Sequence, residues 1–410
     1  MEHHNERIIN GLLKADIEDL TPEEVDARLA ADVSIIVDKE RAIPGDLWPC
    51  IWFLASAIER QFTGKVRIYA GLDRMPPAPV PLGPRCEIQS DEPICGGIRI
   101  LLGDFPAGLG EGIEIRGDAR GNEISCGVPL KTYDPAHPIS SCALAGYLAF
   151  SALARAIGIP PHHESWTQKS IRLVFAPSRK APPSFSVLGV GQVGQAFLSL
   201  AYFLAGGQEV AVHLLDKDTF EDCNQRTQVL LEEAAVALWR GKPKTEYIAA
   251  LCRSWGWAAN GERCEIKWGW RPSQSPSEFA LLGFDNMDAR RIAAEGGFQW
   301  LFECGVGTDF CRPHVSWHSF PPSRDLAKAI FREPKIAVAT SQFAKTLGDG
   351  PGECGRVIFE GVQATAPSLG LVAVAMAWGE AMSANGPAPI SGGAFLWSPL
   401  LPLQRDILYT

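Results

Sequence analysis

A glycine-rich turn near the middle of the chain constrains the fold more than any other feature. It reads Gly189-Val190-Gly191-Gln192-Val193-Gly194. The apolar residues 185–189 before it predict a strand, and residues 192–205 after it predict a helix. A turn of this pattern at such a junction lets the backbone approach a phosphate, whose charge the helix N-terminus favours. On its own, the turn fits NAD, FAD or ATP.

Short buried strands and helices are predicted to alternate after this turn. Strands are expected at 209–215, 279–284 and 299–303, and helices at 232–239, 244–255 and 367–382. This alternation is typical of a parallel sheet with both faces covered, so we expect an α/β fold.

The N-terminal half shows the same order of elements without the glycine pattern. Its expected strands lie at 33–37, 66–70 and 98–102, and its helices at 48–61 and 140–157. We therefore predict two Rossmann-like halves, of which the N-terminal one is degenerate. A charged and proline-rich segment at 177–184 separates the two predicted domains, 1–180 and 184–410. The alternative is an unrelated α/β cap domain in the N-terminal half.

The composition restricts the partners and the compartment. The formal net charge of −9 argues against a nucleic-acid partner. The 11 cysteines include no Cys-x-x-Cys pair, so neither a disulfide framework nor a zinc ribbon is expected, and a reducing compartment is the simpler interpretation. The N-terminus lacks an apolar signal peptide, and the apolar run 366–378 is shorter than the ~20 residues that cross a bilayer. We expect a cytoplasmic protein with no membrane partner.

An ordered set of polar residues follows the glycine turn. The set comprises Asp216-Lys217-Asp218, Asn224, Arg226, Gln228, Gly241-Lys242-Pro243-Lys244 and Phe284-Asp285-Asn286. Activation of a carboxylate by ATP needs a group that holds the ribose, cations beside the phosphates and a carboxylate for Mg²⁺. This set supplies all three kinds of group.

Each residue type suggests a role in that chemistry. Asp216, at the end of a strand, suits the ribose. Lys244 and Arg226 suit the phosphates, and Asp285 suits the metal. In a dinucleotide-binding enzyme Asp216 would also bind the ribose, but hydride transfer has no need of the other three in this order. Taken singly, each has an ordinary alternative as a surface lysine, a loop-capping arginine or a turn residue.

The set resembles the adenylation domain of ubiquitin-activating enzymes and of the sulfur-carrier adenylyltransferases of molybdopterin and thiamine synthesis. That family shows Gly-x-Gly-x-x-Gly, Asp-x-Asp, Asn-x-x-Arg-Gln, Gly-x-x-Lys, and Asp-Asn followed by Arg, which here is Arg290. The departure is that Thr227 stands where the arginine usually does, and Arg226 has moved by one position. The resemblance implies nucleotide contacts from Gly189, Gly191, Gly194, Asp216, Asp218, Asn224, Gln228 and Lys244.

The resemblance covers about 185–382 and extends more faintly over the N-terminal half, which looks like the inactive half of two-part activating enzymes. It implies binding of ATP and Mg²⁺ and adenylation of the C-terminus of a ubiquitin-like protein. A thioester on a cysteine and transfer to a conjugating enzyme would follow. The missing Cys-x-x-Cys pairs predict no zinc, and favour the compact activating enzymes of bacterial ubiquitin-like conjugation, some found in defence-type operons.

Several alternatives stay open at this stage. A sulfur-carrier or peptide adenylyltransferase would lack the thioester step, and a scaffold would bind the carrier without catalysis. A nicotinamide oxidoreductase is a more distant interpretation. A homodimer is possible, and Arg7 is a candidate for the arginine that the inactive half often contributes in this family.

The candidate nucleophile for the thioester is Cys354. It lies in the glycine-rich segment 347–355, within a predicted crossover loop at about 320–360. Cys311 is the second candidate, and Glu353 counts against Cys354 because a neighbouring carboxylate raises the pKa of a thiol. The other cysteines weighed are expected to pack: Cys223, Cys252, Cys264 and Cys304. If neither candidate reacts, the enzyme only adenylates.

Overall fold

The computed structural model describes most of the chain. The described residues are 21–38, 46–72, 75–90, 97–105, 112–127, 129–131, 134–158, 172–174, 181–273, 275, 277–284, 286–306, 314–323, 325, 327, 366–382 and 391–396. The predicted crossover loop lies almost entirely outside these ranges, as do Arg7, Asp285, Cys311 and Cys354.

The strands form two sheets of seven with the same topology. The first has the order β3-β2-β1-β4-β5-β6-β7, and the second has the order β10-β9-β8-β11-β12-β13-β14. In the first sheet the strands are β1 (Val33–Val37), β2 (Val66–Tyr69), β3 (Cys86–Ile88), β4 (Ile98–Leu102), β5 (Ile113–Arg120), β6 (Glu123–Cys126) and β7 (Arg172–Val174). In the second they are β8 (Ser184–Leu188), β9 (Ala211–Asp216), β10 (Ala258–Arg263), β11 (Phe279–Leu282), β12 (Trp300–Val306), β13 (His314–Phe320) and β14 (Ser391–Leu396).

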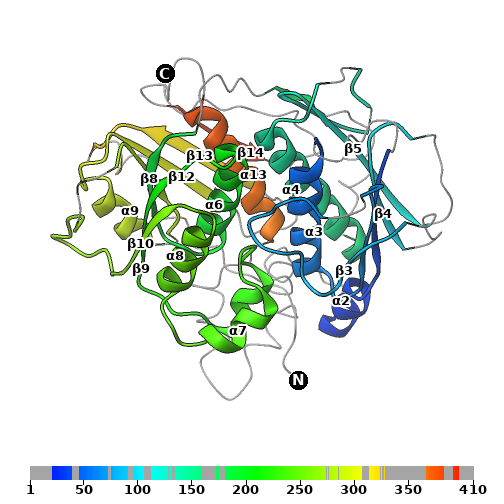
Figure 1. The fold of residues 1–410 in the computed structure, drawn as a ribbon, viewed down its shortest axis with the longest axis horizontal. Helices are drawn as coiled ribbons and strands as arrows, with labels where there is room; N and C mark the ends of the chain where they lie inside the picture. The colour runs from blue at the N-terminus through cyan, green and yellow to red at the C-terminus, as the bar shows by residue number, and fades with distance from the viewer. Residues whose placement is uncertain are drawn as a thin grey trace.

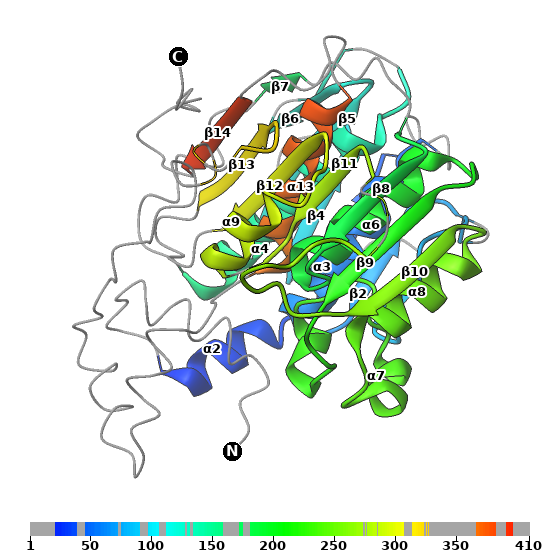
Figure 2. The ribbon, with the colours of Figure 1, turned by 90° about the vertical axis from the view of Figure 1, so that its left-hand side faces the viewer.

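In each sheet the first five strands in chain order pair in parallel, and each of the last two pairs antiparallel with the strand before it. Figure 2 shows the face of the second sheet, with its strands following one another in this order across the view. Because both halves repeat one topology around a βαβ start, the prediction of two Rossmann-like halves is confirmed.

The helices sit mainly between the sheets. They are α2 (Pro22–Leu29), α3 (Trp48–Gln61), α4 (Pro138–Ile157), α6 (Gln192–Ala205), α7 (Glu233–Trp239), α8 (Lys244–Ser254), α9 (Met287–Ala293) and α13 (Pro367–Ala381), with a 3-10 turn at Asp222–Arg226. Figure 1 shows α3, α4, α6 and α13 as a layer in the middle of the molecule, and α13 packs directly on α3, α4 and α6. One hydrophobic core therefore runs through both halves.

The closing helices α4 and α13 meet at a glycine. A Cβ atom on Gly146 of α4 would lie 2.6 Å from the carbonyl oxygen of Ser368 in α13. Next to this crossing, Gln61 donates to the Ser368 hydroxyl at 2.5 Å and the Cys142 thiol donates to the Leu371 carbonyl at 3.4 Å. The missing side chain thus lets the two backbones come close enough for their small residues to interlock.

Arg60 of α3 adds a polar link between the halves. Its buried guanidinium donates to the backbone carbonyls of Gln228, Val229 and Leu231 at 2.9, 3.0 and 3.2 Å. The segment that carries these carbonyls runs from the 3-10 turn to α7, so the first half directly supports that part of the second.

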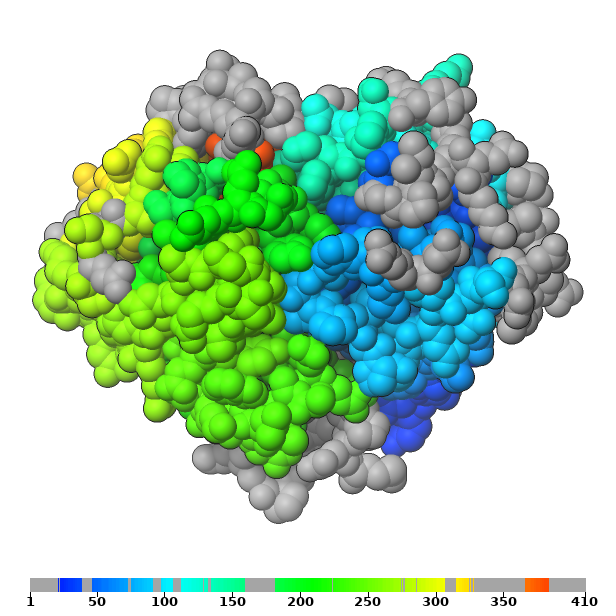
Figure 3. All heavy atoms as spheres, viewed as in Figure 1, coloured from blue at the N-terminus to red at the C-terminus, as the bar shows by residue number. Residues whose placement is uncertain are grey.

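Three tryptophans hold a proline-rich segment of the first half. The indole N–H groups of Trp48 and Trp52 donate to the carbonyls of Pro77 and Val80, each at 2.9 Å. Trp255, which follows α8 in the second half, donates to the Pro79 carbonyl at 2.7 Å. Extended proline-rich backbone leaves its carbonyls free for such donors. Figure 3 shows the blue and green surfaces of the two halves meeting along a continuous seam.

Helix α4 is the one described helix whose length and composition would allow it to cross a membrane. Its residues are almost all buried, and it packs against α3, α13 and the strands of the first sheet. Its apolar character is accounted for by this central position, where it has protein on every side.

Gly146→Ala tests the close crossing of the closing helices. The new methyl group meets backbone that cannot move away, so we expect the free energy of unfolding to fall by roughly 1–3 kcal/mol in urea titrations. The matched control is Gly370→Ala in α13, where a Cβ meets only the flexible end of Gln192 at 3.1 Å. Removing a helical glycine there should be neutral or stabilising by up to about 1 kcal/mol. Equal effects of the two substitutions would contradict the proposed close contact.

Candidate nucleotide site at the carboxyl edge of the second sheet

The three glycines of the turn play three different roles. Gly189 directly follows β8 and has φ 97°, a conformation that other residues rarely adopt, and a Cβ there would lie 2.7 Å from the Gly283 carbonyl carbon. A Cβ on Gly194 would lie 2.1 Å from the Gly189 carbonyl oxygen, so this glycine lets α6 pack onto the turn. Gly191 caps α6, and a Cβ there would have nothing within 4 Å, which leaves open space at the helix N-terminus. A phosphate group fits such a cradle.

Asp216 joins the end of β9 to this turn. It is 7% exposed, and its carboxylate accepts hydrogen bonds from the backbone N–H groups of Val190 at 2.6 Å and Asp218 at 2.9 Å. Burial raises the pKa of Asp216, while these donors and the charge of Lys244 act in the opposite direction. The carboxylate therefore sits directly behind the glycine turn, where the sequence predicts it.

Lys244 is buried at the start of α8, on the same side of the sheet. Its backbone N–H donates to the Asp218 carbonyl at 3.0 Å, and its Nζ lies 3.4 Å from Asp218 Oδ2. The Asp218 side chain is 53% exposed, so the partner of the lysine is a solvent-facing group. The structure thus brings Gly189, Gly191, Gly194, Asp216, Asp218 and Lys244 to one edge.

Asn224 and Gln228 are buried and shape the chain around the turn. Asn224 Oδ1 accepts from the Glu221 N–H at 3.1 Å. Gln228 Oε1 accepts from Gln195 Nε2 at 2.6 Å, and the same Nε2 lies 3.2 Å from the Val190 carbonyl oxygen. Gln195 thereby ties this segment to the glycine turn. Sequence reasoning missed Gln195, because nothing in an apolar helix pattern marks one glutamine as a link.

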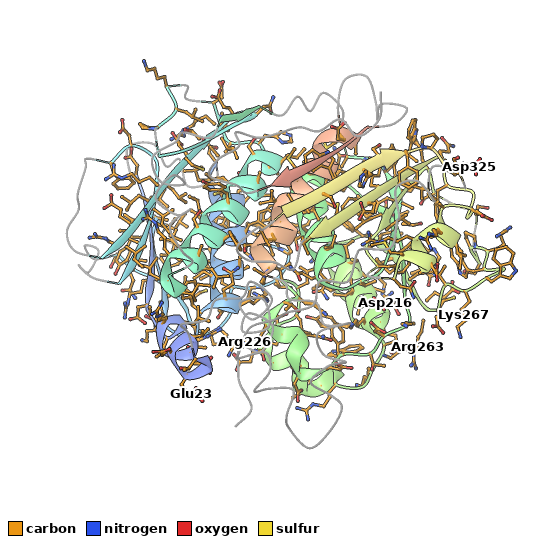
Figure 4. The ribbon with its side chains drawn as sticks, turned by 180° about the vertical axis from the view of Figure 1, so that it is seen from behind. Glu23, Asp216, Arg226, Arg263, Lys267 and Asp325 are labelled. Atoms are coloured by element: carbon orange, nitrogen blue, oxygen red, sulfur yellow. The ribbon has the colours of Figure 1, made fainter. Side chains whose placement is uncertain are left out.

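Arg226 points toward the first half of the molecule. Burial and the nearby Arg85 lower the pKa of its guanidinium, and the acidic groups around it include Glu59. Its Nη1 is buried without a hydrogen-bond partner among the described residues. Figure 4 shows Arg226 on the side of α2, where Glu23 is labelled, and well away from Asp216.

The one-residue displacement of the arginine explains this direction. One step along a 3-10 turn rotates a side chain by about 120°. The family position is occupied by Thr227, which is buried and whose hydroxyl lies 3.4 Å from the Asn224 carbonyl oxygen. No described contact joins Arg226 to Asp216 or Lys244, and its role at the phosphates stays a prediction.

The residues on both sides of position 285 are held firmly. Asn286 caps α9 by accepting from the N–H groups of Asp288 and Ala289 at 2.8 and 3.1 Å. Arg290 donates to the Phe284 carbonyl through Nε at 2.7 Å and also through Nη2. The predicted metal ligand Asp285 itself lies outside the described residues.

Carboxylate oxygens of the kind found at this edge are donors that suit Mg²⁺. Both oxygens of Asp216 accept backbone N–H groups, and one oxygen of Asp218 faces Lys244. In the described part of the chain, no three His, Cys, Asp or Glu side chains converge to hold a metal ion.

The described cysteine side chains are free thiols without an activating environment. They are Cys50, Cys86, Cys126, Cys142, Cys252, Cys264 and Cys304. Burial raises the pKa of each. Even the more accessible Cys264 has acidic neighbours, Glu262 and Glu265, that raise the pKa further. A nucleophile would need a lowered pKa, so none of these seven suits a thioester step.

Comparison with known proteins places this arrangement in a family. Residues 181–386, half of the chain, match the family of the BilD C-terminal domain. The chain belongs to this family. A curated relative, the bacterial E1-like protein BilD of Collimonas sp. (strain OK412), is 25% identical over 207 residues, which are 48% of this chain. The match spans 44% of the length of that relative.

Among solved structures, the chain is similar to E. coli MccB in complex with MccA-N7isoASN and in complex with ATP. Each is 14% identical, with TM-scores of 0.35 and 0.33, and the matches cover 65% and 66% of this chain and 73% of each MccB chain. A structure of PaaA is 13% identical, with a TM-score of 0.33, 61% of this chain covered and 68% of that one.

Substitution of two glycines of the turn separates its roles. Gly191→Ala adds a methyl group to open space at an ordinary φ of −77°, so the thermal midpoint should stay close to that of the wild type. ATP affinity measured by calorimetry should fall roughly tenfold, about 1.4 kcal/mol, because the methyl group fills the phosphate cradle.

Gly194→Ala should instead lower the thermal midpoint, since its Cβ would collide with the Gly189 carbonyl oxygen. An unchanged ATP affinity in Gly191→Ala would exclude a phosphate at this position. A stability loss equal to that of Gly194→Ala would contradict the open space at Gly191.

Proposed function

We propose that this protein activates the C-terminal carboxylate of a small ubiquitin-like protein by ATP-dependent adenylation. The observation that carries the proposal is the glycine turn, open at Gly191, with Asp216 bonded behind it and Lys244 buried beside it in a chain of the BilD family. The E1-like description of the BilD relative agrees with this activity.

In the proposed reaction, a carboxylate oxygen of the carrier attacks the α-phosphorus of ATP. A new P–O bond forms, the bond from the α-phosphorus to the bridging oxygen breaks, and pyrophosphate leaves with the electron pair. The α6 N-terminus and Lys244 stabilise the charge that moves onto the phosphates. Asp216 has lone pairs left for the ribose hydroxyls. Mg²⁺, held by the phosphates and by Asp285, would neutralise the leaving pyrophosphate.

A second step is proposed for a cysteine. The thiolate attacks the adenylated carbonyl carbon, a thioester forms and AMP leaves, after which the carrier passes to a conjugating enzyme. Cys354 is the proposed nucleophile and Cys311 the second choice. Support comes from the described cysteines, whose raised pKa values make them poor nucleophiles. A sulfur-carrier or peptide adenylyltransferase would form the adenylate without a thioester. A scaffold would bind the carrier and form neither.

The first half is proposed to serve as the platform of the active half, within a cytoplasmic protein. The helical faces of the halves already cover each other through α4 and α13. A homodimer would therefore have to use another surface of the molecule.

Lys244→Met tests the phosphate contact. ATP–pyrophosphate exchange, measured with each small protein encoded beside the gene, should fall roughly 10²-fold, the usual loss when one donor to a developing negative charge is removed. Lys242→Met is the matched control, since Lys242 lies in the same turn but stacks over Trp239 at 4.9 Å. Its exchange rate should equal that of the wild type. Tight binding of NAD with none of ATP would instead overturn the proposal.

Cys354→Ala separates conjugation from simple adenylation. It should keep full pyrophosphate exchange and lose the thiol-sensitive adduct with the carrier on a non-reducing gel, because adenylation does not need the thiol. Loss of the adduct only in Cys311→Ala would move the nucleophile. If the wild type exchanges pyrophosphate and forms no adduct, the thioester step is wrong and the adenylyltransferase alternative holds.

A further inference from the structure

A chain of polar and ionisable side chains runs through the second half, from β13 across β12 to the start of α9. Arg290 reaches back from α9 and bonds the Phe284 carbonyl with two of its nitrogens, while Nη1 pairs with Glu303. The other oxygen of Glu303 lies 2.6 Å from Nδ1 of His318. Glu303 and His318 are direct partners in the register of β12 and β13.

The three side chains of this relay, Arg290, Glu303 and His318, are nearly removed from water. Their exposed fractions are 9%, 3% and 11%. Burial alone would raise the pKa of Glu303, but Arg290 and His318 outweigh it, and the net effect is a lowered pKa. Glu303 is therefore a buried carboxylate with a partner on each oxygen.

The backbone leaves room for this arrangement. A Cβ on Gly305 would lie 3.2 Å from Glu303 Oε1 and 2.6 Å from the Ser316 hydroxyl. A larger residue at 305 would displace the carboxylate that receives Arg290. The absence of a side chain at Gly305 thus leaves room for the Glu303 carboxylate that pairs with Arg290.

Sheet stability alone is a weak reason for such a relay. The free energy needed to remove two charges from water is about as large as the free energy gained from their attraction. Apolar residues of similar volume often stabilise a protein as well or better. The relay does fix the direction of the Arg290 side chain. Its Nε and Nη2 donate to the carbonyl of Phe284, the residue before position 285.

We propose that Glu303 and His318 are positioning residues of the adenylation site. They orient Arg290, which fixes the Phe284 carbonyl, while Asn286 caps α9, so the chain is held on both sides of position 285. Asp285 would bind the magnesium of Mg·ATP. The proposal rests on the proposed function for the identity of the ligand. The hydrogen bonds of Arg290 and Asn286 do not depend on it.

The test variant is His318→Leu. It leaves the Arg290–Glu303 pair intact, so the buried charges stay balanced and the protein should fold. A matched control is His213→Leu, since His213 forms a similar pair with Glu262 on β9 and β10, at 3.5 Å, without contact to this turn. His318→Asn keeps a donor near the position of Nδ1 and should restore the wild-type behaviour.

Two measurements are made on the full chain. In calorimetry, His318→Leu should bind Mg·ATP roughly 10-fold more weakly than the wild type, because removal of a residue that positions a metal ligand weakens metal binding by about this factor. It should bind metal-free ATP as tightly as the wild type. In hydrogen–deuterium exchange without nucleotide, the amides of 284–289 should exchange several-fold faster. Both effects should be absent in His213→Leu and reversed in His318→Asn.

The two failures are distinguishable. If the wild type binds no Mg·ATP, the proposed function and the metal part of this inference are both wrong. Faster hydrogen–deuterium exchange at 284–289 in His318→Leu would still show that the relay orders this segment. If the wild type binds Mg·ATP and His318→Leu matches it in both measurements, the relay is overturned. An equal change in His213→Leu would also overturn it, since the effect would then be general destabilisation.

Discussion

The packing of α4 against α13 is the contact on which the molecule depends. Each helix closes its own sheet, and each would expose a long apolar surface if the other were absent. Their close approach at Gly146 turns two sheets into one body with a shared core. Because a buried apolar surface stabilises by about 25 cal/mol per Å², a helix that is covered on all sides contributes more than one half-exposed to water.

This joint core also explains how the first half can matter without a nucleotide site. Arg60 holds three carbonyls of the segment that follows the 3-10 turn, and Trp255 donates to the proline-rich segment of the first half. Gln228 lies in the segment that Arg60 holds, and through Gln195 it reaches the Val190 carbonyl in the glycine turn. A continuous set of buried hydrogen bonds therefore runs from the first half to the proposed phosphate cradle.

At the carboxyl edge of the second sheet, the polar groups divide into two kinds. Asp216 and Gln228 are bonded to the protein and keep the turn in shape. Lys244 faces a half-exposed aspartate, and Gly191 faces open space. Groups of the second kind are available to a ligand. The site thus combines groups that keep the turn in shape with a cation and a helix N-terminus that face open positions.

The sequence by itself determined the doubled α/β architecture and the placement of the glycine turn, Asp216 and Lys244 at one edge. Apolar periodicity marks buried parallel strands and their helices, and the turn, the strand end and the helix start are local features. The antiparallel strands β6, β7, β13 and β14 were not predicted, nor were the parallel strands β3 and β5. For β10, whose residues 258–263 are largely polar, only a strand around Cys264 was expected. Such strands are defined by pairing with distant neighbours, which periodicity does not report.

Only the tertiary structure decided which side chains meet. It turned Arg226 toward the first half, because a shift of one residue in a 3-10 turn changes the face on which a side chain lies. It also joined Arg60 to carbonyls more than 160 residues away and His318 to Glu303 across two strands. These contacts arise from the packing of whole layers, so no local pattern in the chain announces them.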